Sequence, residues 1–312
     1  MADTRVATGF GLAEIVAPLT PDEFLARHWP AEAYCASEDP ARAERIVAAA
    51  PELESARAVL AEARPVTVFK PDGSTAAVPD GQAAWPLYML GLTCYVAARH
   101  IPGLQPVVDG LTADLGLPAG SMECEVFCSD GASGARMHSD FDLNFALLLR
   151  GRKRWRVAPN RHIRNQTGVC VPSTREQPAP FQLEIADETP FPPARPDDAR
   201  TLEVGPGGLV FLPRGWWHET EAEGECLQVN FVVKRPLWLR VMTGAIGERL
   251  MRDPGWRGFA LDLFGPAERR ERAIAELAEL LPSFRLILDE LLDGDPEEAA
   301  RRIVEGSGLR PA

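Results

Sequence analysis

The chain has 312 residues, and its hydrophobic and charged fractions of 46% and 25% are typical of a globular protein with a sizeable core. The formal net charge of −12 argues against nucleic acid as a general partner, because an acidic surface repels phosphates. No apolar run is long enough to span a membrane and no secretory signal is visible, so we expect a cytoplasmic protein with no membrane partner.

The six cysteines do not form a recognisable metal or disulfide framework. None of them makes a C-x-x-C motif, and the two that lie four residues apart, Cys124 and Cys128, have no histidine nearby. Scattered thiols of this kind are typical of buried, reduced cysteines in the cytosol.

The N-terminal part of the sequence predicts helices and one hairpin. Residues 13–64 read as helical, with T-P-D-E at 20–23 placing an N-cap before a proline at the first helical position. A hairpin is expected over residues 65–78, where V-T-V-F-K and S-T-A-A-V flank a P-D-G turn. Residues 85–100 and 104–115 read as buried helices.

The middle of the sequence predicts β-strands. Strands are expected over 123–128, 143–150, 153–157, 205–212 and 227–234, with residues 150–152 as a tight turn. A proline-rich connection, residues 158–202, contains F-Q-L-E-I and has the composition of a lid or substrate loop. Helices return over 238–251, 267–281, 284–292 and 296–305. This order favours an antiparallel jelly roll with helices before and after it.

One strand of this core carries polar side chains at alternate positions. In the segment M-H-S-D-F-D-L-N-F, His138 and Asp140 are two residues apart, and Asp142 and Asn144 continue the series. Residues i and i+2 of a strand point to the same face. Polar groups on an inner face are unfavourable unless they bind something, so the pattern predicts a ligand.

Two further residues complete this pattern. His218, in P-R-G-W-W-H, would join His138 and Asp140 as a set of two histidines and one carboxylate, which binds one face of a non-haem Fe(II) ion and leaves the other positions open. Lys153 lies fifteen residues after His138, and a hairpin would bring it back beside the metal strand. A lysine in a pocket is a point cation suited to one end of a dicarboxylate.

These motifs resemble a known family. H-S-D with Asn at plus six, then G-R-K-R-W-R-V, and later F-L-P-R-G-W-W-H with V-N-F, are similar to the JmjC (cupin-type) Fe(II)- and 2-oxoglutarate-dependent oxygenases. Upstream, E-V-F-C-S-D-G-A-S-G resembles the strand and loop before the metal motif. The similarity covers residues 85–236 and is greatest to the small JmjC hydroxylases of the asparaginyl hydroxylase and ribosomal oxygenase types.

The resemblance implies a role for each motif residue. His138, Asp140 and His218 would be the iron ligands, and Lys153 would pair with the distal carboxylate of 2-oxoglutarate. Asn144 and Asn230 match positions that hydrogen-bond near the metal-bound end of this cosubstrate. The third reactant would be dioxygen.

The sequence departs from the family at one position and leaves some roles open. Some relatives have a threonine where this chain has Ala135, and Ser133, Tyr88 or Tyr95 would have to replace it at the distal carboxylate. Asp142 would touch substrate or pair with an arginine such as Arg136. Trp216 and Trp217 are expected to pack in the core rather than to stack on substrate.

The resemblance predicts a mainly β fold of the double-stranded β-helix (jelly-roll, cupin-like) type with helical additions, α+β overall. We expect a helical region at 1–64, the core at 65–236 and a helical region at 237–312. The predicted reaction is hydroxylation of a C–H bond in a peptide or protein side chain. The alternatives are a hydroxylase of a small molecule or carrier-bound amino acid, and a non-catalytic cupin that binds a metal and a metabolite.

The C-terminal helices carry apolar stripes that need a partner surface. Ile274, Leu277 and Leu281 fall at helical spacing, and a second stripe is expected after Pro282, which should break the helix. The stripes leave open whether that surface is the outside of the jelly roll or the same helices of a second subunit. Because related JmjC hydroxylases often dimerise through C-terminal helices, the resemblance implies a homodimer, with packing within the same chain as the alternative.

Overall fold

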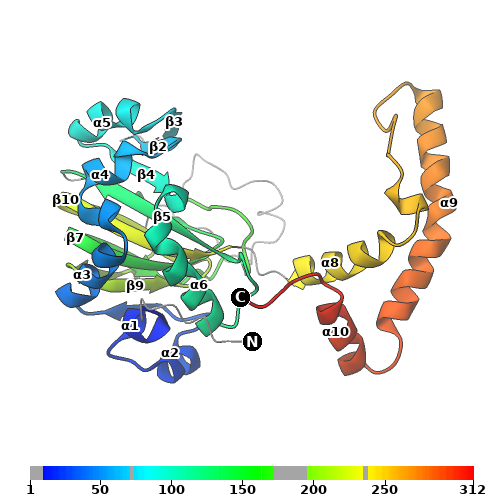
Figure 1. The fold of residues 1–312 in the computed structure, drawn as a ribbon, viewed down its shortest axis with the longest axis horizontal. Helices are drawn as coiled ribbons and strands as arrows, with labels where there is room; N and C mark the ends of the chain where they lie inside the picture. Colours follow the sequence, from blue (N-terminus) through cyan, green and yellow to red (C-terminus); the bar gives the residue numbers. More distant parts are fainter. Residues whose placement is uncertain (1–9, 71–73, 132, 163, 172–194, 235–237) are drawn as a thin grey trace. The chain divides into compact units, whose positions relative to one another are not determined.

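The computed structural model describes residues 10–70, 74–131, 133–162, 164–171, 195–234 and 238–312 (Figure 1). They form two compact units. The first holds the described residues of Met1–Gly116 and Gly120–Lys234, and the second holds those of Leu117–Ala119 and Arg235–Ala312. The sheet lies entirely in the first unit. The part of the predicted lid or substrate loop that contains F-Q-L-E-I lies outside the described residues.

Short helices precede and interrupt the strands of the first unit. They are α1 (Leu12–Val16), α2 (Pro21–Arg27), α3 (Pro40–Ala49), α4 (Ala56–Ala61), α5 (Gly81–Met89) and α6 (Gln105–Asp114), with 3₁₀ turns η1 (Pro51–Glu54), η2 (Ala98–His100) and η3 (Pro102–Leu104). The predicted cap of α2 is confirmed, because the Glu23 N–H donates to the Thr20 hydroxyl at 3.3 Å and the Thr20 N–H donates to the Glu23 carboxylate at 3.0 Å. This reciprocal pair satisfies two otherwise free donors at the helix start.

Two predicted helical stretches contain strands instead. Residues within 13–64 form β1 (Tyr34–Ala36), and the predicted helix over 85–100 ends early and is followed by β4 (Thr93–Ala97). Helix α5 stops at Met89, and Gly91 follows with a φ of +86°. This left-handed conformation terminates a helix, and the T-C-Y-V residues after it favour a strand.

The described strands form one antiparallel sheet with the order β1-β9-β7-β10-β5-β4-β2-β3. Their bounds are β1 (Tyr34–Ala36), β2 (Val66–Phe69), β3 (Thr75–Val78), β4 (Thr93–Ala97), β5 (Met122–Ser129), β6 (His138–Ser139), β7 (Leu143–Ala158), β8 (Arg200–Val204), β9 (Leu209–Leu212) and β10 (Trp217–Val233). The predicted hairpin at 65–78 is confirmed as the antiparallel pair β2 and β3.

The long strands β7 and β10 organise the sheet (Figure 1). At one end of this pair, β7 is hydrogen-bonded to β9 and β10 to β5. At the other end, β7 is hydrogen-bonded to β8 and β10 to β6. The pair therefore runs through two sheets that share it, as in a jelly roll. The expected mainly β core with helical additions is confirmed.

The predicted turn at residues 150–152 is wrong, because β7 continues without reversal from Leu143 to Ala158. Gly151 has a φ of +83°, and a Cβ atom there would lie 2.2 Å from the carbonyl oxygen of Glu225 on β10. The glycine thus permits a local distortion and a close approach of two backbones, not a hairpin.

This distortion is a bulge that changes which residues of β7 face inward. Leu148 lies opposite Gln228, but Arg150 lies opposite the next residue of β10, Leu227, so β7 contains one extra residue there. Between Arg150 and Arg152 it is β10 that contains two extra residues, and an even number leaves its own alternation unchanged. Before the bulge the even-numbered Ala146 and Leu148 belong to the inner cluster, and after it the odd-numbered residues do: Trp155 and Val157. A bulge shifts the two-residue alternation of a strand by one. Lys153 therefore faces inward.

The opposite face of the same strands packs under the N-terminal helices. Phe145 of β7 and Phe211 of β9 are fully buried, with ring centroids 4.7 Å apart. Phe24 of α2 lies 5.8 Å from Phe145 and 5.1 Å from Phe211, and Trp29 lies 6.1 Å from Phe145. We call this side of β7, β9 and β10 the outer face, and the side with Trp155 and Val157 the inner face.

The second unit consists of helices α8 (Trp238–Leu250), α9 (Ala267–Leu292) and α10 (Pro296–Glu305), with the 3₁₀ turn η4 (Gly255–Arg257). The expected break at Pro282 is wrong: α9 runs through the proline. The apolar residues Ile274, Leu277 and Leu281 of α9 are 49%, 46% and 50% exposed. Among the described residues, no helix has the length and apolarity needed to cross a membrane.

Candidate metal centre and anion pocket

The three predicted metal ligands lie together on two neighbouring strands. His138 begins β6, which has only two residues, and pairs directly with His218 on β10. Their ring centroids are 4.1 Å apart. Asp140 directly follows β6, before a bend at residues 141–142, and lies beside both rings. One ligand atom from each residue lies within 4.8 Å of the others.

Hydrogen bonds orient both imidazoles with the same nitrogen toward Asp140. The Nδ1 atom of His138 contacts the carbonyl oxygen of Arg136 at 2.7 Å, and Nδ1 of His218 contacts that of Trp216 at 3.0 Å. The two Nε2 atoms lie 3.7 and 3.5 Å from the Oδ2 atom of Asp140. A backbone acceptor at Nδ1 fixes the tautomer that leaves Nε2 free for a metal. These residues fit a divalent cation.

The electrostatics of this corner favour neutral histidine. Burial, reinforced by the neighbouring His138, lowers the pKa of His218 to about 4, although Asp140 acts in the opposite direction. Metal binding requires the unprotonated ring, so no proton must be displaced from His218 at neutral pH. Two neutral imidazoles and one carboxylate carry a single negative charge, which suits a divalent ion with open positions.

Lys153 is buried on the inner face among Gln228, Phe127 and Trp155, and we call these four residues the Lys153 pocket. Its side chain is only 4% exposed, and its Nζ donates to Oε1 of Gln228 at 3.1 Å. The aromatic rings of Phe127 and Trp155 each lie 5.8 Å from Nζ. Burial lowers the pKa of Lys153 to about 8. Within the described ranges the hydrogen-bond partner of Lys153 is the neutral amide of Gln228 and no carboxylate pairs with it, so an anion bound there would stabilise the buried cation.

Trp155 links the two parts of the site. Its ring stacks against His218 with centroids 6.0 Å apart, and it also lies beside the Lys153 ammonium. On β10, His218, Thr220 and Ala222 lie opposite Val157, Trp155 and Lys153 of β7. The metal corner and the Lys153 pocket are therefore neighbouring positions on one continuous inner face.

The two predicted asparagines lie on this face at the other end of the strand pair. Asn230 is 3% exposed, and its Oδ1 accepts from Nε2 of Gln228 at 2.6 Å, so it joins the chain that leads to Lys153. Asn144 is half-buried on β7, and its Oδ1 is buried without a hydrogen-bond donor from the described protein. An unsatisfied acceptor of this kind is available to a ligand.

Asp142 pairs with a lysine rather than with Arg136. Its Oδ2 accepts from Nζ of Lys234 at 3.0 Å, and the same Nζ lies 3.1 Å from Oε1 of Glu125. The hydroxyl of Tyr95 also donates to Glu125, at 2.9 Å. Burial raises the pKa of both carboxyl groups, and Lys234 opposes that effect.

None of the three predicted replacements for the family threonine is hydrogen-bonded to Lys153. Tyr95 is engaged with Glu125, Tyr88 is buried, and the Ser133 hydroxyl bonds to Thr93 at 3.0 Å. At the Ala135 position the backbone N–H donates to the hydroxyl of Thr220 at 3.0 Å.

Sequence reasoning missed the residues that shape the Lys153 pocket. Gln228, Trp155 and Phe127 come from three strands and meet only after the strands pair. The available signal was alternation, because Gln228 precedes Asn230 by two residues and Trp155 follows Lys153 by two. Positions i and i+2 share a face of a strand, so the predicted Asn230 and Lys153 place Gln228 and Trp155 on the same face.

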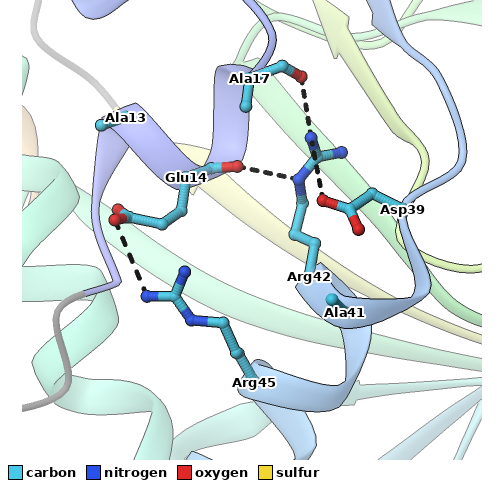
Figure 2. Close-up of a pocket in the computed structure, with 7 residues that line it drawn as sticks. All are labelled: Ala13, Glu14, Ala17, Asp39, Ala41, Arg42 and Arg45. Atoms are coloured by element: carbon cyan, nitrogen blue, oxygen red, sulfur yellow. Dashed lines mark hydrogen bonds and ion pairs between the residues drawn. The ribbon is translucent and has the colours of Figure 1, made fainter.

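A surface hollow near the N-terminus contains charged residues but no free site (Figure 2). The buried guanidinium of Arg42 donates to the carbonyl oxygens of Glu14 and Ala17, both at 2.8 Å, and to that of Gly207. Arg45 forms an ion pair with Glu14 at 3.7 Å. Arg42 thus has a structural role, joining α1 and α3 to the turn before β9.

Comparisons with known proteins agree with this architecture. The chain is 26% identical over 330 residues to "Uncharacterized protein YxbC" of Bacillus subtilis (strain 168), covering 94% of each. A structure of YcfD, titled a ribosomal oxygenase from Escherichia coli, is 19% identical with a TM-score of 0.51 over 93% of this chain and 71% of that one. A second YcfD structure, with cobalt and 2-oxoglutarate, has 19% identity and a TM-score of 0.49 over the same shares.

At these identities the structural likeness establishes the fold alone. The family assignment comes from sequence: a model of the cupin-like domain matches residues 28–233, about two thirds of the chain. That range includes every predicted ligand and anion-binding residue, and it confirms the resemblance to the cupin-type JmjC proteins. The chain therefore belongs to the family of cupin-like domains.

Proposed function

We propose that this protein is an Fe(II)- and 2-oxoglutarate-dependent dioxygenase that hydroxylates a C–H bond of a peptide or protein side chain. One observation carries the proposal: a two-histidine, one-carboxylate cluster lies one aromatic ring away from a buried lysine that has no anionic partner in the described chain. A metal alone would not need that cation. An anionic cosubstrate bound beside the metal would contact both the metal and the lysine.

Each residue of the metal corner then has a defined task. His138 and His218 hold the metal through Nε2, and Asp140 holds it through a carboxylate oxygen. The carbonyl oxygens of Arg136 and Trp216 keep the rings aligned. When bound, the metal and 2-oxoglutarate supply, with dioxygen, the oxidising power for C–H hydroxylation, and the cosubstrate leaves as succinate and carbon dioxide.

The inner face supplies the rest of the cosubstrate site. Lys153 would pair with the far carboxylate of 2-oxoglutarate, and the rings of Trp155 and Phe127 exclude water around that contact. Asn230 and Asn144 would hydrogen-bond near the metal-bound end. Exclusion of water strengthens the lysine–carboxylate attraction, because it is screened less than at the surface.

A protein substrate is our first choice because YcfD, whose fold this chain shares, is titled a ribosomal oxygenase. We also propose a homodimer formed through α9, because three of its apolar side chains at helical spacing are about half exposed in the single chain. The cytoplasm is the proposed compartment, since all six cysteines are unpaired.

Mass spectrometry tests the reaction directly. The full-length protein is incubated with Fe(II), ascorbate, 2-oxoglutarate and either candidate peptides or a host lysate, with His218→Ala as the control. We expect succinate, and a polypeptide that gains one oxygen atom only with the wild-type protein. Oxygen gained by a small metabolite instead would favour the small-molecule hydroxylase. Metal and 2-oxoglutarate binding with no succinate from any substrate would favour the non-catalytic cupin.

A further inference from the structure

The metal ligands His138 and Asp140 sit on a very short strand. β6 has two residues and pairs with β10 only through Trp217 and His218. Two pairs of residues give few ladder hydrogen bonds, and such short strands are weakly specified in register. Something besides the sheet must hold the backbone that carries these ligands.

Ser139, the residue between the two ligands, is held by the side chain of Gln166 and by two backbone hydrogen bonds to Cys170, of 2.9 and 3.0 Å. Ser139 is fully buried; its hydroxyl donates to Oε1 of Gln166 at 3.0 Å, and its carbonyl oxygen accepts from Nε2 of Gln166 at 2.9 Å. Oε1 also accepts from Asn160 at 3.0 Å, and Nε2 also donates to the carbonyl of Gly168 at 3.0 Å. Both acceptor positions and both donors of the amide are used.

The same glutamine is joined to the segment that precedes His218. Nε of Arg214 donates to the backbone carbonyl of Gln166 at 2.7 Å. The next residue, Gly215, has a φ of +87°, and its N–H donates to the carbonyl of Asp140 at 2.8 Å. Residues 214–215 lie four and three residues before the third ligand, His218. They therefore connect the segment that carries His218 to both Gln166 and Asp140.

We infer that Gln166 is a positioning residue of the metal centre: its buried side-chain amide adds to the short β6 pairing and to the Ser139–Cys170 backbone bridge, and it fixes the His138–Asp140 pair relative to His218. The inference rests on the metal site of the proposed function. It also assigns a role to the described start of the proline-rich connection, residues 159–162 and 164–170, which holds Ser139 in place between the two ligands. Groups that orient metal ligands typically change metal affinity by roughly 10–100-fold when removed.

The test is Co(II) binding by the full-length protein, followed by its visible absorption, without turnover. Gln166→Met keeps the length of the side chain and removes its four hydrogen bonds. The matched control is Thr112→Val in α6, which removes a buried 2.6 Å hydrogen bond to Val108 far along the chain from the ligands. Thermal unfolding of each apoprotein separates stability from metal affinity.

We expect Gln166→Met to weaken Co(II) binding by roughly 10–100-fold and to alter the absorption bands, while Thr112→Val lowers the unfolding temperature and leaves affinity and bands unchanged. Ser139→Ala, which removes only the hydroxyl contact, should fall between them, and it decides the question if Gln166→Met does not fold. Wild-type affinity and bands in Gln166→Met, or in Ser139→Ala where only that variant folds, would overturn the inference. Failure of the wild-type protein to bind Co(II) would remove the metal site and the proposed function with it.

Discussion

The inner and outer faces of the strand pair β7 and β10 share one backbone but differ in chemistry. The outer face carries the fully buried Phe145 and Phe231, and Phe145 packs against Phe211 and Phe24 with no polar partner. The inner face carries His218 and Lys153, both at most 5% exposed. Burial without a ligand is favourable for the first face and unfavourable for the second. Both faces bury apolar side chains, but the buried polar groups that need a ligand lie on the inner face.

The largest expected effect is on the inner face, at the metal. Replacing His218 by alanine removes one of three ligands, so we expect loss of stoichiometric Fe(II) or Mn(II) binding and of turnover. Anaerobic metal titration followed by elemental analysis measures this. A His218→Ala protein that retains full metal affinity and activity would rule out this ligand set.

The second prediction concerns the packing of aromatic side chains on the outer face. Phe145→Ala should lower the free energy of unfolding by about 3–5 kcal/mol, because it leaves a cavity among Phe24, Phe211 and Trp29. Urea denaturation measures the loss. The folded fraction should bind 2-oxoglutarate normally; weaker binding with unchanged stability would show that the two faces are not separate in function.

The third prediction concerns the anion pocket. Hydrogen bonds to charged groups contribute about 1.5–3 kcal/mol, so Lys153→Ala should weaken 2-oxoglutarate binding by at least about tenfold. Lys153→Arg keeps the charge and should be milder. Calorimetric titration in the absence of oxygen gives both affinities. Equal affinity in the alanine variant and the wild type would assign the carboxylate to another cation.

The fourth prediction is a pH dependence set by the same lysine. The pKa of Lys153 is lowered to about 8, so the ammonium is charged below that pH and neutral above it. The affinity for 2-oxoglutarate should be constant near neutral pH and fall by about tenfold per pH unit above 8. Lys153→Arg stays protonated throughout and should show no such decline. The same decline in the arginine variant would locate the titrating group elsewhere.

The smallest expected effect is a change in apoprotein stability, and its sign should differ between the inner and outer faces. Lys153→Met replaces a buried cation by an apolar side chain of similar length. Because burial penalises the charged lysine at neutral pH, the stability of the apoprotein should be unchanged or raised by about 1 kcal/mol. Phe145→Ala on the opposite face should instead lower the stability of the protein. A marked loss of stability in Lys153→Met would mean that the lysine holds the fold together.

The sequence was sufficient to predict the class of fold and that three candidate ligands lie together. Alternation in H-S-D and a distant histidine predicted a metal corner, and the structure brings those three residues together. The residue pattern predicted most of the core strands and pointed to Lys153, and the resemblance supplied the role of that lysine. The helix cap at Thr20 could also be predicted from the sequence, because it depends only on residues three positions apart.

The remaining features depend on contacts between distant residues. The inward direction of Lys153 requires a change of alternation, which the sequence suggested as a hairpin and the structure provides as a bulge against β10. Gly151 is compatible with either. Gln166 gave no signal, because a single glutamine in a proline-rich stretch has no pattern until Ser139 lies beside it.

The most direct test asks whether the metal corner and the Lys153 pocket form one site. The affinity for 2-oxoglutarate is measured without oxygen, with and without Fe(II), in the wild type and in Lys153→Ala. We predict that Fe(II) strengthens binding in the wild type, and that Lys153→Ala weakens it by at least about tenfold while still binding one Fe(II). Affinities that depend neither on Fe(II) nor on Lys153 would contradict a shared site.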